Sequence, residues 1–114
     1  MRILLSNDDG FAAAGLEALA DRLSAEHELY IVAPDRERSG VSHATTFREH
    51  VLLRQVTERG FSCSGTPADC VLYSLLGAIE FAPEVVISGI NYGANLGSDI
   101  IYSGTAAAAR QAAL

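Results

Sequence analysis

Two adjacent aspartates, Asp8 and Asp9, are the first residues whose types and spacing could do chemistry. On a regular strand, adjacent side chains point to opposite faces, so both reach one site only where the chain has left the strand. Gly10 permits such a turn. Two crowded carboxylates repel each other unless a cation lies between them, and hard oxygen donors favour Mg²⁺ or Mn²⁺. The alternative is an Asx-type turn in which Asp9 caps the following helix.

Two neutral oxygen donors could complete such a metal site. Ser39 lies in a long polar loop, and Asn91 follows a short apolar run. Taken alone, a Ser-Gly pair is most simply a turn, and an Asn in this position is often only a cap. Their significance depends on whether the fold brings them to the two acids.

A third group of residues suits phosphate. Ser103, Gly104 and Thr105 precede an Ala-rich segment, 106–114, that should be helical. The start of a helix presents free N–H groups and the positive end of the helix dipole, and both favour anions. Asn95 lies in the Gly- and Asn-rich loop just before, a composition that suits oxyanion binding. The alternative for Ser103 and Thr105 is an ordinary helix cap.

His43 and the arginines of the same long loop allow two interpretations. His43 could donate a proton, although a histidine facing solvent is the simpler interpretation. Arg36 and Arg38 alternate with Asp35 and Glu37, which most simply forms a solvated cluster of ion pairs.

The elements around these residues predict an α/β fold with a Rossmann-like, doubly wound, mostly parallel sheet between two helical layers. Because ligands bind beyond the carboxyl ends of the strands in such sheets, the three polar clusters should meet there. Short continuous apolar runs indicate strands buried on both faces, a helical spacing of apolar residues indicates a helix, and turn residues separate these elements. Strands are expected at 3–5, 29–33, 51–56, 61–64 and 85–87, a long loop at 34–50, and helices at 14–25, from Thr66 through Ile79, and at 106–114.

Composition narrows the classes of function. The chain has 114 residues, which indicates one domain, and a formal net charge of −6 without any basic run, which argues against a nucleic-acid polymer as partner. All eight basic residues are Arg, so no mechanism that needs a lysine is available. Cys63 and Cys70 are too few for a disulfide scaffold and are expected to be reduced thiols. With no stretch of transmembrane length, we expect a cytoplasmic protein that does not enter a membrane.

Four motifs in order resemble one family. They are Met1-Arg2-Ile3-Leu4-Leu5-Ser6-Asn7-Asp8-Asp9-Gly10, Val32-Ala33-Pro34-Asp35-Arg36-Glu37-Arg38-Ser39-Gly40, Gly65-Thr66-Pro67-Ala68-Asp69-Cys70, and Ser88 through Gly97 continuing to Tyr102-Ser103-Gly104-Thr105. Together they are similar to SurE, the stationary-phase survival protein E family of 5′-nucleotidases. Because SurE proteins are about twice as long, residues 1–114 are expected to be the N-terminal part of the SurE-like phosphohydrolase domain, with the C-terminal part absent.

The resemblance implies a ligand set and an activity. It implies that one divalent cation, Mg²⁺ or Mn²⁺, is held by Asp8, Asp9, Ser39 and Asn91, with Asp8 and Asp9 also catalytic. It implies that phosphate is held by the residues Asn95, Ser103, Gly104 and Thr105. The implied reaction is hydrolysis of nucleoside 5′- (and often 3′-) monophosphates by metal-activated water, in a homodimer or homotetramer when the protein is full-length.

Two alternatives stay open at this point, and a third is nearly excluded. An aspartyl-phosphate phosphatase would use Asp8 or Asp9 as nucleophile, but such enzymes separate the two acids by one residue. A fragment that binds metal or nucleotide without turnover is compatible with the short chain. A signalling receiver domain needs a lysine near its last strand, and this chain has none.

Overall fold

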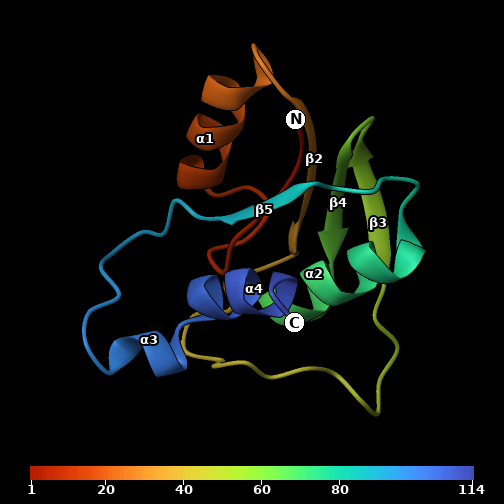
Figure 1. The fold of residues 1–114 in the computed structure, drawn as a ribbon. Helices are drawn as coiled ribbons and strands as arrows, with labels where there is room; N and C mark the ends of the chain where they lie inside the picture. The colour runs from red at the N-terminus through yellow and green to blue at the C-terminus, as the bar shows by residue number, and fades with distance from the viewer.

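A mostly parallel five-stranded sheet forms the centre of the protein, whose computed structural model describes residues 1–114 (Figure 1). The strand order is β3-β4-β2-β1-β5, in which only β3 runs antiparallel to its neighbour. The strands are β1 (Arg2–Ser6), β2 (Glu28–Pro34), β3 (Leu53–Thr57), β4 (Gly60–Cys63) and β5 (Val85–Ser88). The helices are α1 (Ala14–Ser24), α2 (Pro67–Tyr73) with a π-helical turn η1 (Ser74–Ala78), α3 (Asp99–Tyr102) and α4 (Gly104–Ala112).

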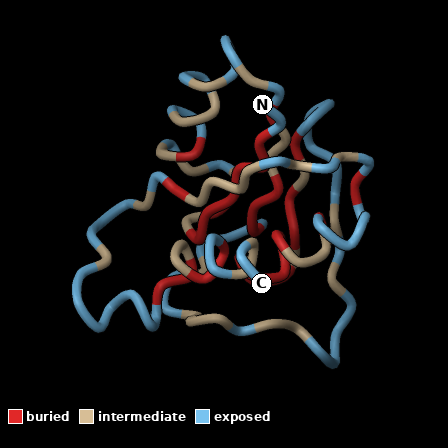
Figure 2. The backbone as a smooth tube through the Cα atoms, viewed as in Figure 1, coloured by how far each residue is buried: buried red, intermediate tan, exposed pale blue.

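Strand β1 is buried on both faces, as its continuous apolar run predicts. Ile3 and Leu5 pack with Leu16 of α1 on one face of the sheet. Leu4, between them, packs with Cys70 of α2 on the opposite face. The buried residues therefore follow the central strands and the helices that cover them (Figure 2). The predicted α/β architecture, with a doubly wound sheet between two helical layers, is confirmed.

The edges of the sheet differ in burial from its centre. β3 and β4 form the hairpin expected around Gly60, and β4 joins the sheet parallel to β2. β5 pairs only with β1, and all four of its residues are half-buried, so it is less buried than its apolar sequence predicts.

No helix of the protein is both long enough and apolar enough to cross a membrane.

Helix α2 begins as its sequence predicts but ends early. Thr66 accepts a hydrogen bond from the Asp69 backbone, while the Asp69 carboxylate accepts one from the Thr66 backbone, which completes a capping box. The helical path ends near Gly77, where φ is +93°. Leu75 and Leu76 are consequently exposed, and the regular helix predicted through Ile79 ends before its last residues.

Parallel strands place the polar clusters at one edge of the sheet. β2 lies on one side of β1 and β5 on the other, so the strand order reverses at β1. Ser6, at the end of β1, pairs in register with Ser88 at the end of β5. A crevice for ligands is expected beyond the carboxyl ends of the strands at this switch point, and the loop after β1 carries the two aspartates.

Candidate metal and phosphate site

The turn after β1 is closed by Asn7 and not by an aspartate. The Asn7 amide Nδ2 donates to the Gly10 carbonyl at 2.9 Å, and its Oδ1 accepts from the Gly10 N–H at 3.2 Å. Gly10 has φ of +110°, where glycine is favoured. Helix α1 has Ala13 at its N-cap with no side-chain cap, so the alternative in which Asp9 caps this helix was wrong. Both aspartates are therefore free for other partners.

Asp8 is a buried carboxylate at the meeting point of two elements. It is only 3% exposed, and its Oδ1 accepts a hydrogen bond from the Thr105 hydroxyl at 2.6 Å. Gly104 lies so close that a Cβ there would sit 2.8 Å from the Asp8 Cβ and 3.2 Å from Oδ2. No protein group donates to Oδ2. The start of α4 thus packs directly on Asp8 and leaves one carboxylate oxygen free.

Asp9 reaches toward the loop after β5. Its Oδ2 accepts a hydrogen bond from the Tyr92 backbone N–H at 2.7 Å, and its Oδ1 has no protein donor. Asn91 directly precedes Tyr92 and lies half-buried, with its Nδ2 donating to the Gly93 carbonyl at 3.1 Å. That bond fixes the amide and leaves the Asn91 Oδ1 as a free acceptor. The loop after β5 is therefore joined to Asp9, as the shared sheet edge predicts.

Ser39 is brought beside the acids by the residue before it. The Arg38 backbone N–H donates to the Asp8 carbonyl at 2.7 Å. Ser39 itself is exposed, and its backbone N–H donates to the Glu37 carboxylate at 3.2 Å. Hydrogen bonds from the side chain and then the backbone of Ser39 lower the pKa of the exposed Glu37 carboxyl below its ordinary value. Glu37 therefore restrains Ser39, a role that the alternating charges of the loop do not reveal.

The start of α4 has the geometry that phosphate binding needs. Ser103 is buried, and its Oγ caps the helix by accepting from the Ala106 N–H at 3.1 Å. The N–H groups of Gly104 and Thr105 fall in the first turn, where no intrahelical acceptor exists. Because the Thr105 hydroxyl donates to Asp8 and Gly104 packs against the same side chain, these N–H groups lie close to Asp8. Ser103 is thus a helix cap in this structure, and capping leaves the adjoining N–H groups available.

Two residues of interest from the sequence lie apart from this contact network. Asn95 is half-buried in the β5–α3 loop, and its side chain forms no hydrogen bond to either acid. His43 bonds through Nε2 to Gln111 Oε1 at 2.8 Å, toward the far end of α4. Gln111 lies about 9 Å along the helix from Thr105. His43 therefore anchors its loop against α4, and the structure does not place it at the acids as a proton donor.

The oxygen atoms around Asp8 and Asp9 are of the kind that binds one hard cation. Asp8 is buried yet forms no ion pair, and an unpaired buried charge is costly unless a cation compensates it. Each aspartate keeps one free oxygen, and the residues next to Asn91 and Ser39, Tyr92 and Arg38, are hydrogen-bonded to Asp9 and Asp8. No group of three His, Cys, Asp or Glu side chains gathers anywhere in the chain, so any cation here would depend on the neutral oxygens of Asn91 and Ser39. Oxygen ligands of this kind suit Mg²⁺ and Mn²⁺.

Comparison with known proteins gives the family. Residues 3–114 match the family model described as survival protein SurE. The chain belongs to the SurE family. A 5′-nucleotidase SurE from Treponema pallidum is 54% identical over all of this chain and 63% of that protein. One from Geotalea uraniireducens is 49% identical over all of this chain and 46% of that protein.

The solved SurE protein from Aquifex aeolicus has the same fold. It superimposes with a TM-score of 0.91 at 42% identity, over 98% of this chain and 46% of that one. The family resemblance and the fold expected from the sequence motifs are therefore confirmed. The chain spans roughly half the length of most of the SurE relatives it matches.

Proposed function

We propose that this SurE chain carries the metal and phosphate site of a phosphomonoesterase that acts on nucleoside 5′- and 3′-monophosphates. One observation supports this most directly: the Thr105 hydroxyl bonds to the buried Asp8 carboxylate at 2.6 Å. That contact joins a pair of acids suited to a cation with a helix start suited to an anion. A metal-bound phosphate ester needs both within the same few ångströms.

The protein residues divide into three roles in this proposal. Asp8 and Asp9 would hold one divalent cation through their free oxygens, with Ser39 and Asn91 as neutral ligands. The cation, Mg²⁺ or Mn²⁺, would polarise the phosphoryl group and acidify water. The backbone N–H groups of Gly104 and Thr105 would stabilise charge on the phosphoryl oxygens, as pre-oriented donors do.

Further residues complete the proposed site. Ser103 orients the helix start by capping it, and Asn95 would supply an amide to the phosphate. Because Asp8 is buried and Asp9 half-buried, Asp9 is better exposed to orient an attacking water. We assign it that role.

The test is phosphate release from a panel of nucleoside monophosphates, in EDTA and then with Mg²⁺ or Mn²⁺ restored. We expect release only with metal. Asp9→Asn should lower turnover by at least about 100-fold, since general-base assistance and metal coordination each contribute on that scale. Asp21→Asn is the matched control, because Asp21 is exposed on α1 and outside the site.

The outcomes separate the proposed mechanism from its alternatives. Full activity in Asp9→Asn would remove the metal-centred mechanism. A trapped phospho-enzyme would indicate an aspartyl-phosphate phosphatase instead. Nucleotide and metal binding without turnover would mean that this chain is a binding fragment of the enzyme and needs the rest of the SurE protein for catalysis.

The resemblance also leads us to propose a cytoplasmic protein that forms a homodimer or homotetramer when full-length. Sedimentation of the full-length protein and fractionation of its host would test these two proposals. A monomer at micromolar concentration would contradict the first.

A further inference from the structure

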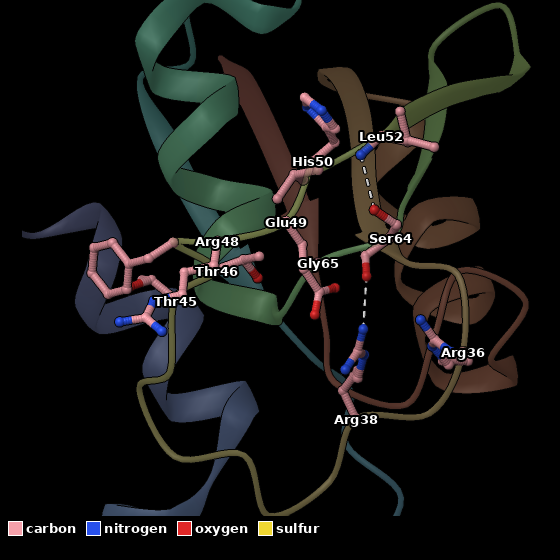
Figure 3. A pocket seen from close by; sticks show the side chains of 12 residues that line it. Arg36, Arg38, Thr45, Thr46, Arg48, Glu49, His50, Leu52, Ser64 and Gly65 are labelled. Carbon is pink, nitrogen blue, oxygen red and sulfur yellow. Dashed lines mark hydrogen bonds between the residues drawn. The ribbon is translucent and has the colours of Figure 1, made fainter.

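A hollow of about 600 Å³ is lined by residues of the long loop, among them three arginines, Arg36, Arg38 and Arg48 (Figure 3). The chain has only eight basic residues and a net charge of −6, so this concentration of guanidinium groups is unusual for it. Glu49 is the one acid in the lining, and His50 adds a further polar group. The lining therefore carries more arginines than acids, although the chain as a whole is acidic.

Two of the three guanidinium groups lack an anionic partner. Arg36 pairs with Asp35 at 3.3 Å, whereas Arg38 and Arg48 form no ion pair. Arg38 donates through Nη2 to the Ser64 carbonyl at 2.7 Å, but its Nε is buried and has no partner. A buried donor without an acceptor is uncommon in folded proteins. A planar guanidinium with free donors matches phosphate oxygens in geometry as well as in charge.

The wall between the hollow and the proposed metal site is one short backbone segment. Arg38 lines the hollow with its side chain, while its backbone N–H bonds to the Asp8 carbonyl at 2.7 Å. Gly10 packs against the Arg36 carbonyl group, where an added Cβ would approach within 3.4 Å. A ligand with one phosphate at the acids could therefore extend across this segment into the hollow.

The opposite rim of the hollow is held rigidly by a buried carboxylate. Asp69 is fully buried and accepts hydrogen bonds from the Thr46 N–H at 3.0 Å and the Thr46 hydroxyl at 2.6 Å. Leu52 N–H donates to the Ser64 Oγ at 2.8 Å on the far side. The segment that carries Arg48 is thus held by hydrogen bonds on both sides, at Thr46 and at Leu52, and these bonds define the shape of the hollow.

We propose that this arginine hollow binds a second phosphate group of the nucleotide, so that the protein favours nucleoside bisphosphates over monophosphates. The inference rests on the proposed function, because it assigns the first phosphate to the acids. The two phosphates of an adenosine 3′,5′-bisphosphate would then be held by different groups: one by the cation and the start of α4, the other by Arg38 and Arg48.

The test is calorimetric binding, with Mg²⁺ present, of adenosine 3′,5′-bisphosphate and adenosine 5′-monophosphate analogues in which a methylene group replaces each ester oxygen, so that no hydrolysis occurs. We expect the bisphosphate to bind about tenfold more tightly, the scale of one charge-assisted contact at a partly exposed site. Arg48→Gln and Arg38→Gln should each reduce that ratio toward one. Arg22→Gln, which removes one exposed charge on α1, should leave the ratio unchanged.

Several results would overturn the inference. Equal affinity for the bisphosphate and the monophosphate is one such result, and an unchanged affinity ratio in both arginine variants is another. A third such result concerns inorganic phosphate. If it binds together with the monophosphate, and binds more weakly to Arg48→Gln, the hollow holds a free anion and not the second phosphate of the substrate. Arg48 forms no hydrogen bond in the fold, so its variant stays informative if Arg38→Gln unfolds.

Failure of this inference differs from failure of the proposed function. Metal-dependent monophosphate hydrolysis without any bisphosphate preference would remove only the arginine site. A bisphosphate preference that depends on Arg48, without any monophosphate hydrolysis, would keep the arginine site and remove the proposed reaction.

Discussion

Gly104→Ala tests whether the start of α4 and Asp8 work as one unit. The new Cβ would lie 2.8 Å from the Asp8 Cβ and 3.0 Å from the Pro67 Cγ. Restoring an ordinary contact of 3.4 Å to Asp8 requires a shift of about 0.6 Å. Asp8 cannot move freely, because it is buried and tied to Thr105. The substitution therefore displaces either the carboxylate or the helix start.

The expected effect on stability is small, because two contributions oppose each other. Overpacking a tight site costs about 1–3 kcal/mol. Alanine gains about 1 kcal/mol over glycine in a helix. The net loss is about 1 kcal/mol, which corresponds to a melting temperature lower by about 4–8 °C in a domain of this size. The substitution should leave the protein folded at assay temperature.

The expected effect on activity is larger. A misplacement of about 1 Å at a reacting centre costs about 100-fold, so 0.6 Å should cost at least about tenfold in kcat/KM. Ala106→Gly is the matched control, since it weakens the same helix by about 1 kcal/mol without approaching Asp8. The assays are phosphate release and Mn²⁺ titration. Wild-type turnover and Mn²⁺ affinity in Gly104→Ala would refute the coupling between α4 and Asp8.

Two further predictions follow from hydrogen bonds to buried carboxylates, one at Thr105 and one at Asp69. Thr105→Val removes the hydrogen-bond donor to Asp8, so it should lower the free energy of unfolding by about 1–2 kcal/mol and weaken metal binding. Thr105→Ser keeps the hydroxyl and should bind Mn²⁺ as the wild type does in a titration. Asp69→Ala leaves the Thr46 and Thr66 donors without their acceptor and should cost about 3 kcal/mol in denaturant unfolding. If Asp69→Ala lowers the free energy of unfolding by less than about 1 kcal/mol, the hydrogen bonds of Asp69 do not hold α2 and the long loop together as we infer.

The sequence predicts which segments meet, because the rule behind that prediction is topological. Parallel strands end at one edge of a sheet, so the loops after β1, β2 and β5 must lie together whatever their sequences. Contacts from Asp8 to Arg38 and from Asp9 to Tyr92 follow that rule. The sequence alone does not predict which side chain shapes the turn. Asn7 and Asp9 are both able to form an Asx turn, and only the three-dimensional path of the chain selects Asn7.

Long-range partners are the part that sequence patterns do not predict. The Thr66-Pro67-Ala68-Asp69 motif predicts a local capping box, and the structure contains one. The same carboxylate also binds Thr46, which is 23 residues earlier in the chain. No local pattern encodes that second contact, yet it fixes the rim that carries Arg48 toward the hollow. A residue that looks like an ordinary helix cap in the sequence therefore joins α2 to the long loop. This loop carries both the arginine hollow and Ser39, which we propose as a metal ligand.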